Sequence, residues 1–476
     1  MGRRTMGAPR AQRVMTNLTI ESVDLEGQGV AHAEGKVIFV AGALTGERVD
    51  VEVMREQPRY AKAKAVYWHR ESSDRVRPRC PHFGVCGGCS MQHASNEAQI
   101  AIKQRALEDA LWHIGQIKPL TILSPLRGPS FGYRSRARLS VRWVDKKDQL
   151  LIGFRERGTW HVALMDSCEV LLPQVSALLP HFNQLISSLS VVRDIPQLEV
   201  AVGDNTQVYV MRHLSPLTDE DLDKCRAFEQ QWHVQIWLQP KGPATAAPIS
   251  PNQPTLTYSL PEFNLSMPFS PVDFTQVNFP INRVLVKRAI DLLDVQSHHR
   301  VADFFCGLGN FSLALGRRAR EVVGIEGSQA LTDQAMANAK VHGLGERMSF
   351  SRLDLFRVDR TWLDALGSFD RVLIDPPREG AQALSEALAE QSLDGQGPAR
   401  IVMVSCNPAT LARDAAILAH KGRYQLSQAG AVNMFPQTAH VESIAVFDRL
   451  PPEPPTHPTH PMHPTDPQAS PMKNAL

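Results

Sequence analysis

Short runs of alternating apolar and polar residues, separated by glycine, fill residues 18–68. Examples are Lys36-Val-Ile-Phe-Val40 and Ala61-Lys-Ala-Lys-Ala-Val-Tyr67. Alternation with a period of two is typical of strands that bury one face, and five such runs fall within about fifty residues. So many short strands in so little chain predict a small β-barrel of the OB type.

The pattern changes near residue 271, where strand-like runs begin to alternate with helix-like segments. Apolar positions in residues 282–293 recur at the spacing of an amphipathic helix. Strand candidates then follow at residues 300–305, 322–326, 349–353, 371–374 and 401–405. This alternation predicts a Rossmann-like, doubly wound α/β domain, and the stretch before it, residues 96–268, reads as α+β.

The two ends of the chain lack a pattern that could bury a core. The amino terminus is basic and rich in turn formers, and the chain after Phe447 is rich in proline and histidine. We expect both ends to be disordered. The expected units are a basic arm, a barrel, a central α+β domain, an α/β domain and a tail, at residues 1–14, 15–72, 73–270, 271–449 and 450–476.

Net charge is nearly balanced at +2 over 476 residues, so any case for nucleic acid depends on local basic runs. Lys62 and Lys64 alternate with alanine close to Tyr67, which fits a single-stranded nucleic-acid surface and fits a solvated strand face equally well. A second run has four basic positions: Arg134, Arg136, Arg138 and Arg142. On a strand these arginines would line one side, and the absence of an intervening acid favours phosphate contact.

The seven cysteines are unevenly spaced, which favours metal and catalytic roles in a reducing compartment over disulfides. The chain has no apolar stretch of membrane-spanning length and no signal-peptide pattern at its start. A cytosolic protein with no membrane partner is therefore expected.

A glycine turn, Gly307-Leu308-Gly309, follows the strand candidate at residues 300–305 and would let the backbone approach a ligand closely. Glu326 ends the next strand candidate, where an acid could hold a ribose diol. These features suit NAD or S-adenosylmethionine. Because Asn310-Phe311-Ser312 stands where the dinucleotide fingerprint has its third glycine, S-adenosylmethionine is favoured.

Functional side chains gather at the carboxyl ends of the strand candidates: Phe305, Glu326, Asp354, Asp375 and Cys406. Ligands of doubly wound sheets bind at that edge. Cys406 follows a buried apolar run and precedes Asn407-Pro408, a helix start. A helix amino terminus or a nearby cation raises the thiolate fraction, so Cys406 is predicted to be a nucleophile.

A second cysteine group, Cys80-Pro-His-Phe-Gly-Val-Cys86-Gly-Gly-Cys89, has Cys168 as a distant fourth member. Four thiolates can hold a tetrahedral zinc ion or an iron–sulfur cluster. The spacing alone does not choose between the two metals.

Motifs in order along residues 271–447 resemble those of the RNA uracil-C5 methyltransferases. They are Asp273-Phe-Thr-Gln-Val-Asn278, Asp303-Phe-Phe-Cys-Gly-Leu-Gly-Asn-Phe311, Asp375-Pro376, Ser405-Cys-Asn-Pro-Ala-Thr-Leu-Ala-Arg-Asp414 and His440-Val-Glu-Ser443. The resemblance implies that Cys406 is the nucleophile and Glu442 the base. It also implies a set of S-adenosylmethionine contacts: Gln276, Phe305, Asn310, Glu326, Asp354 and Asp375. Asp354 stands where this family commonly has asparagine.

The cysteine group is similar to that of the iron–sulfur members of this family that act on 23S ribosomal RNA. Those members carry a [4Fe-4S] cluster and an amino-terminal TRAM barrel. The resemblance therefore implies that Cys80, Cys86, Cys89 and Cys168 bind a cluster and that residues 15–72 are a TRAM barrel.

The expected activity is methylation of C5 of a uridine in 23S ribosomal RNA by a monomeric enzyme. Thiolate addition at C6 would turn C5 into a nucleophile, and a base would afterwards remove the C5 proton. One alternative is the same chemistry on transfer RNA. Another is an iron–sulfur protein that binds RNA without catalysis.

Overall fold

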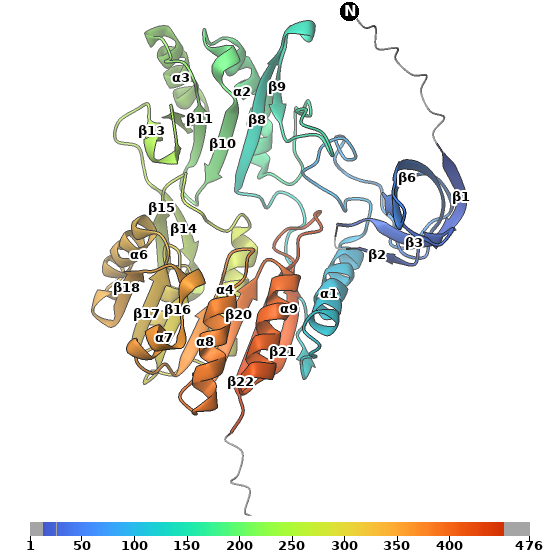
Figure 1. The fold of residues 1–476 in the computed structure, drawn as a ribbon. Helices are drawn as coiled ribbons and strands as arrows, with labels where there is room; N and C mark the ends of the chain where they lie inside the picture. Colours follow the sequence, from blue (N-terminus) through green and yellow to red (C-terminus); the bar gives the residue numbers. More distant parts are fainter. Residues whose placement is uncertain (1–12, 25, 452–476) are drawn as a thin grey trace, which may run out of the picture.

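The computed structural model describes residues 13–24 and 26–451, so the expected arm and tail lie almost entirely outside the described residues. The described chain forms a small barrel, a central sheet with helices, and a larger α/β sheet (Figure 1). In the described part of the chain, no helix is both long and apolar enough to cross a bilayer.

The barrel is a six-stranded sheet of order β1-β5-β6-β4-β3-β2, curled round its own apolar side chains. Its strands are β1 (Val14–Thr19), β2 (Ser22–Val23), β3 (Gly29–Ala33), β4 (Lys36–Ala41), β5 (Arg48–Glu56) and β6 (Tyr60–Arg70). The sequence predicted five strands, but the first run breaks between Thr19 and Ser22 and gives two. Along β6 the alanines are buried while Lys62 and Lys64 are exposed, as their alternation predicted.

The central sheet has strand order β13-β12-β11-β10-β8-β9, and two helices pack on one of its faces (Figure 1). The elements are β8 (Arg136–Val144), β9 (Gln149–Gly153), α2 (Pro173–Ser187), β10 (Gln197–Val202), β11 (Gln207–Arg212), α3 (Asp219–Trp232), β12 (Gln235–Gln239) and β13 (Ala247–Pro248). Phe182 of α2 packs on Tyr209 of β11 with ring centroids 4.3 Å apart. The other face carries the charged residues of β8.

The larger sheet has eight strands in the order β18-β17-β16-β19-β20-β22-β21-β7. The strands are β7 (Thr121–Ile122), β16 (Arg300–Phe304), β17 (Glu321–Glu326), β18 (Met348–Arg352), β19 (Arg371–Ile374), β20 (Arg400–Ser405), β21 (Tyr424–Val432) and β22 (Glu442–Arg449). The accompanying helices are α4 (Phe279–Leu293), α5 (Ser312–Gly316), α6 (Gln329–Val341), α7 (Arg360–Ala365), α8 (Gln382–Leu393) and α9 (Pro408–Ala416).

Strands β16 to β20 pair in parallel, and β22 is inserted antiparallel between β20 and β21. The chain proceeds outward from β16 in both directions, so a topological switch point lies between β16 and β19. The predicted doubly wound α/β architecture is confirmed.

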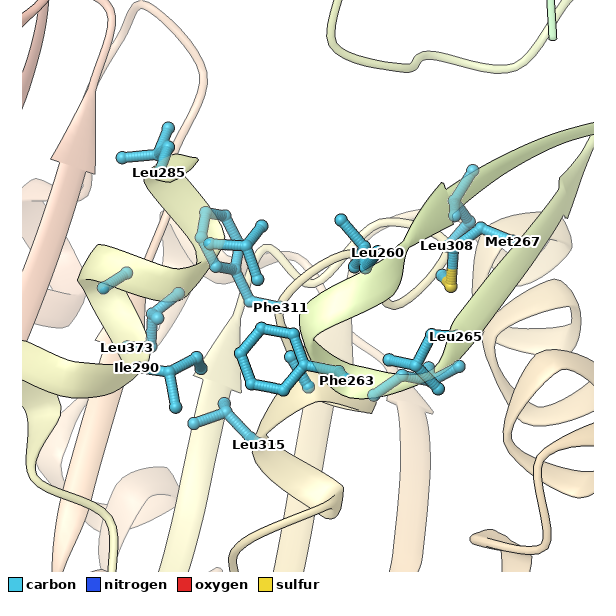
Figure 2. Packing of buried hydrophobic residues seen from close by; sticks show 14 of the residues in the cluster. Leu260, Phe263, Leu265, Met267, Leu285, Ile290, Leu308, Phe311, Leu315 and Leu373 are labelled. Carbon is cyan, nitrogen blue, oxygen red and sulfur yellow. The ribbon is translucent and has the colours of Figure 1, made fainter. Parts of the chain in front are cut away.

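A hairpin of β14 (Leu256–Leu260) and β15 (Leu265–Phe269) joins the central sheet to the larger one. Figure 2 shows Leu260, Phe263 and Leu265 beside α4 and α5, in one buried cluster with Ile290 and Leu315. The hairpin therefore shares a hydrophobic core with the larger sheet, which fixes the segment that leads into α4.

Helix α1 (Asn96–His113) also belongs to the packing of the larger sheet, although it lies far from it in sequence (Figure 1). Its first turn is capped by Ser95, whose hydroxyl accepts from the backbone N–H of Ala98. Leu107 and Leu111 pack in the same buried cluster as Leu411 and Ala415 of α9. Helix α1 thus covers the helix that follows Cys406.

One buried lysine on α1, Lys103, is expected to make the stability of the fold depend on pH. Lys103 is 1% exposed, and burial lowers its pKa to about 7. An unfolded lysine titrates near pH ~10.4, so between these values the unfolded chain binds more protons than the folded one. Stability should therefore rise with pH across this window.

Replacing Lys103 by Met should remove that dependence. Thermal melts of the two proteins between pH 7 and about 10 would show the wild type gaining stability relative to Lys103→Met as the pH rises. Parallel pH curves for the two proteins would contradict the lowered pKa.

Candidate active site

A cavity of about 540 Å³ lies at the carboxyl ends of β16, β17, β19 and β20. It is lined by every candidate side chain that the sequence placed at a cofactor or catalytic site: Gln276, Phe305, Asn310, Glu326, Asp354, Asp375, Cys406 and Glu442. The structure thus brings together residues spread over more than 160 positions (276 to 442) in one concave site of the size usual for small-molecule ligands.

The glycine turn after β16 forms one wall of this cavity. Phe305, Gly307 and Gly309 have φ angles of 65°, 56° and 96°, a left-handed region that glycine occupies without steric cost and phenylalanine rarely adopts. The backbone N–H of Gly307 donates to Glu326 Oε2 at 3.2 Å, and that of Ser328 donates to Oε1 at 3.1 Å. These bonds fix the carboxylate at the end of β17.

The Asn310 amide is held on two sides. Its Oδ1 accepts from the Tyr258 hydroxyl and from Asn282 Nδ2, both at 2.9 Å, and its Nδ2 donates to Asn282 Oδ1 at 3.0 Å. Asp354, by contrast, is exposed at the rim, where its side chain accepts from the backbone N–H of Phe356 at 3.1 Å. Asn310 therefore lies on an inner wall of the cavity and Asp354 at its open edge.

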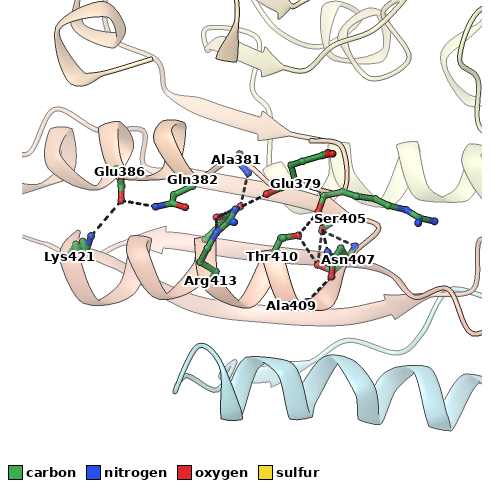
Figure 3. Close-up of polar contacts among 12 residues, drawn as sticks. Glu379, Ala381, Gln382, Glu386, Ser405, Asn407, Ala409, Thr410, Arg413 and Lys421 are labelled. Atoms are coloured by element: carbon green, nitrogen blue, oxygen red, sulfur yellow. Dashed lines mark hydrogen bonds and ion pairs between the residues drawn. The ribbon is translucent and has the colours of Figure 1, made fainter. Parts of the chain in front are cut away.

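The turn after β20 is fixed by a network of short-range hydrogen bonds (Figure 3). Asn407 N–H donates to Ser405 Oγ at 3.2 Å, and Asn407 Oδ1 accepts from the N–H of Ala409 at 3.1 Å, which caps α9. Asn407 Nδ2 and Thr410 Oγ1 both donate to the carbonyl of Arg378, at 3.1 and 3.2 Å. Cys406 is thereby held between a strand end and a helix start, as its sequence context predicted.

Glu442 lies next to Cys406 because of strand pairing. The first residue of β22 is Glu442, and Ser405 pairs with Ser443 in the β20–β22 ladder. Glu442 is 3% exposed, and Cys406 is half-buried. The two side chains therefore enter the cavity from neighbouring strands.

Two buried acids determine the protonation of this corner. Burial raises the pKa of Asp375 to about 7, and burial together with the charge of Asp375 raises the pKa of Glu442 well above its usual range. Burial raises the pKa of Cys406 to about 11, the charges of Glu442 and Asp375 act in the same direction, and Arg378 opposes them. The start of α9 was expected to favour a thiolate, but without a ligand the adjacent acids and the burial keep Cys406 as a thiol.

The cavity lining also includes residues that the sequence had not selected as site residues, among them Phe274, Arg378, Phe435 and His440. Arg378 Nη2 lies 3.4 Å from His440 Nδ1. The sequence holds a signal for two of these residues. Arg378 directly follows Asp375-Pro376-Pro377, and His440 stands two positions before Glu442. Phe435 is placed there only by the tertiary structure.

The four cysteines of the second group line another cavity, of about 230 Å³, together with Arg134, Thr438 and His440. Burial raises the pKa of Cys89 to about 12 and of Cys168 to about 11, and the neighbouring cysteine sulfurs add to both shifts. Within residues 13–24 and 26–451, no three His, Cys, Asp or Glu side chains are close enough together to bind a single metal ion. The sulfurs thus surround a shared space instead of converging on one point.

The turn between Cys86 and Cys89 approaches the backbone of the central unit closely. A Cβ on Gly87 would lie 2.9 Å from the carbonyl oxygen of Arg155, and the N–H of Gly87 donates to that oxygen at 2.8 Å. The N–H of Gly88 donates to Cys86 Sγ at 3.3 Å. Glycine at this turn lets the cysteine segment dock against the loop after β9.

The arginine run only partly follows its expected arrangement. Arg136, Arg138 and Arg142 share the face of β8 that α2 and α3 leave uncovered, and Arg142 lies 4.4 Å over the ring of Trp160. Arg134 precedes β8 and lines the cysteine cavity instead, because its backbone pairs with Leu171 outside the sheet. Strand periodicity cannot apply to a residue outside the strand.

The fold and the site together define an RNA-modifying methyltransferase class. The chain belongs to the tRNA (uracil-5-)-methyltransferase family, whose model matches residues 95–449, and a TRAM domain matches residues 13–66. The resemblance inferred from the motifs and the TRAM barrel are therefore confirmed.

Within that class, the similar proteins described next share the same name. A Bordetella pertussis protein named 23S rRNA (uracil(1939)-C(5))-methyltransferase RlmD is 58% identical over 434 residues, which cover 91% of this chain and 93% of the relative. A protein of the same name from Cupriavidus pinatubonensis is 54% identical over 440 residues, covering 91% and 95%.

A solved structure confirms the architecture. The Pyrococcus abyssi tRNA (uracil-54, C5)-methyltransferase, solved in complex with S-adenosyl-L-homocysteine, matches with a TM-score of 0.68 and 23% identity. The match covers 91% of this chain and 100% of that one. At this identity the likeness concerns the fold.

Proposed function

We propose that this protein transfers a methyl group from S-adenosylmethionine to C5 of a specific uridine in 23S ribosomal RNA. The observation that carries the proposal is the single cavity in which Cys406 and Glu442 meet the glycine turn and Glu326. The ribosomal substrate is supported by the relatives at 54–58% identity, which share that name. The family model bears the name of transfer-RNA enzymes, so transfer RNA is the alternative substrate.

Cys406 acts as the nucleophile. Its sulfur, after losing its proton, forms a bond to C6 of the uracil, and the electron pair moves to C5, which becomes an enolate carbon. The bound methyl donor supplies an electrophilic sulfonium methyl group, which C5 attacks. Glu442 then takes the C5 proton, the sulfur–C6 bond breaks, and the C5–C6 double bond re-forms.

The charges in the cavity favour this sequence once its ligands are bound. The positively charged sulfonium of the methyl donor, bound beside Asp375 and Glu442, would stabilise their carboxylate forms. It would thereby lower the raised pKa values of both acids. The Arg378 guanidinium already opposes the upward shift in the pKa of Cys406. Glu442 then accepts a proton in a desolvated site, where a carboxylate is a stronger base than in water.

The remaining cavity residues suit the parts of the methyl donor. Glu326, already oriented by two backbone N–H groups, is placed for a ribose diol, and Asp354 for the base edge at the open rim. Gln276, Phe305, Asn310 and Asp375 complete the walls. A ribonucleotide can reach Cys406 only if it is extruded from its stack.

We propose that RNA is held by the barrel at residues 15–72 and by the central domain at residues 73–270, while residues 271–449 carry the chemistry. Two exposed basic groups can contact RNA phosphates. One is Lys62 and Lys64 on β6, and the other is Arg138 and Arg142 on β8. The enzyme acts as a monomer in the cytoplasm.

Cys80, Cys86, Cys89 and Cys168 are proposed to hold a [4Fe-4S] cluster. A single zinc ion needs sulfurs converging at about 2.3 Å from one point, whereas each cysteine of a cluster binds a different iron. The shared cavity of about 230 Å³ suits the second arrangement. The N–H of Gly88 on Cys86 Sγ and the cationic Arg134 suit an anionic cluster.

The covalent mechanism separates the roles of the two catalytic residues. Cys406→Ala should abolish turnover and leave binding of the methyl donor measurable by calorimetry. Glu442→Gln should trap a methylated protein–RNA adduct, seen as a band that survives denaturing electrophoresis, because the adduct can no longer lose its C5 proton.

A wild-type enzyme that forms no adduct with RNA containing 5-fluorouridine would contradict this mechanism. Position mapping on ribosomal and transfer RNA from cells with and without the protein identifies the substrate. Loss of a methyluridine from transfer RNA only would select the alternative substrate.

The iron and sulfide content of the purified protein tests the proposed cluster. Protein purified without oxygen should contain about four iron and four sulfide per chain. Cys89→Ser should lose most of this iron, whereas Cys225→Ser, which removes a buried thiol of α3 outside the cavity, should keep it. One zinc per chain, or iron unaffected by Cys89→Ser, would rule out the proposed cluster.

A further inference from the structure

One loop borders both cavities. Residues 433–441 connect β21 to β22 and end directly before Glu442. Phe435 and His440 of this 433–441 loop line the reaction cavity, and Thr438 and His440 line the cysteine cavity. Whatever fixes this loop therefore fixes the wall of the reaction site and the approach to the proposed base.

The loop is also held by contacts from outside it, which meet at Gln437. Gln437 has a φ of 68°, a left-handed conformation that costs a non-glycine residue free energy and persists only where surrounding contacts enforce it. Gln437 N–H donates to Gln99 Oε1 at 2.9 Å, and Gln99 Nε2 donates back to Gln437 Oε1 at 3.0 Å. The backbone N–H groups of Ser90 and Met91 both donate to the Gln437 carbonyl at 3.0 Å.

Lys103 is one of three side chains that donate to the first half of the loop; the others are Asn278, to the Met434 carbonyl at 3.1 Å, and Tyr133, to the Pro436 carbonyl at 2.8 Å. Lys103 Nζ donates to Asn433 Oδ1 at 2.7 Å and to the carbonyl of Phe435 at 2.8 Å. Lys103 is 1% exposed, and in the described chain no acidic side chain forms an ion pair with it. Both hydrogen bonds of its amine go to the loop. Because Gln99 and Lys103 are four residues apart on α1, they lie on one helix face, which is the face that receives the loop.

We propose that Lys103 is a positioning residue, which through the 433–441 loop sets where His440 and Glu442 stand in the reaction cavity. A buried lysine that only stabilised the core would be expected to bond to the core elements around α1. Lys103 bonds instead to the segment that forms the cavity wall and leads to Glu442. Because the role matters only if Glu442 takes the C5 proton, it rests on the proposed function.

Loss of the Lys103 hydrogen bonds should impair one step of the reaction, the removal of the C5 proton by Glu442. Without the Lys103 amine, Asn433 Oδ1 loses its donor, and the Phe435 carbonyl keeps only the bonds from Thr438 within the loop. The buried Asn433 acceptor is then unsatisfied, which favours a shift of the loop. Attack by Cys406 depends on β20 and α9, which Lys103 does not contact through hydrogen bonds. Proton removal by Glu442 depends on the loop, so the adduct should form and then decay slowly.

The test compares three variants of the full-length protein on natural RNA. Lys103→Met removes both donors, and Lys103→Gln keeps an amide NH₂ with two donors on a shorter side chain. Leu107→Ala is the matched control, since it weakens the same helix at a position that is 0% exposed and packs away from the loop. The readouts are kcat, the KM for RNA, affinity for S-adenosylmethionine, and the fraction of enzyme in a covalent adduct during turnover.

Lys103→Met should lower kcat by roughly 10²-fold, the order expected for misplacement of a reacting group by about 1 Å. Its KM for RNA and its affinity for S-adenosylmethionine should stay near the wild-type values, and covalent adduct should accumulate as in Glu442→Gln. Lys103→Gln should recover part of kcat. Leu107→Ala should lose thermal stability without accumulating adduct.

Unchanged kcat in Lys103→Met, or equal adduct fractions in Lys103→Met and Leu107→Ala, would overturn the positioning role while leaving the proposed function intact. Absence of any adduct with 5-fluorouridine RNA in the wild type would overturn the function itself, so the two failures are distinct. If Lys103→Met does not fold, Asn433→Ala removes one acceptor from the loop side. Adduct accumulation in that variant supports the role, and its absence overturns it.

Discussion

The hydrogen-bonding register between β20 and β22 is the constraint on which the site depends. Ser405 pairs with Ser443, so Cys406 and Glu442 stand at adjacent ends of two antiparallel strands. Because successive side chains of a strand point to opposite faces, a slip of one residue would turn Glu442 away from the cavity. The register is fixed by burial, since residues of both faces of β22 are buried against α4 on one side and α9 on the other.

The topology of the sheet assigns different tasks to its two halves. On one side of the switch point, β16 and β17 end in the glycine turn and in Glu326, whose carboxylate is fixed by two backbone N–H groups. On the other side, β19, β20 and β22 end in Asp375, Cys406 and Glu442, three groups whose pKa values burial raises. In the proposed function, a methyl donor at the first half and a uracil at the second would meet where the strands diverge.

Sequence periodicity predicted most of the elements and the strand-end residues of the cavity, whereas Gln276, Asn310 and Glu442 were selected only through the family resemblance. Alternation predicted the barrel, and the strand ends at Phe305, Glu326, Asp354 and Asp375 follow from the rule that parallel strands end at one edge. Periodicity is local, so it could not show that Arg134 leaves the strand to line the cysteine cavity. Nor could it show the raised pKa of Cys406, which results first from burial and then from the acids that neighbouring strands bring near.

The least predictable feature is the part of the site that comes from distant sequence. Helix α1 and β7 precede the central sheet in the chain, yet they pack on α9 and β21 at the edge of the larger sheet. A lysine within an amphipathic helix reads as a solvated residue, and only the fold shows that Lys103 is buried beneath the 433–441 loop. Ser90 and Met91, which follow Cys89, donate to the Gln437 carbonyl of the same loop. One loop therefore contributes to the walls of both cavities and is held by segments on either side of the central sheet in sequence.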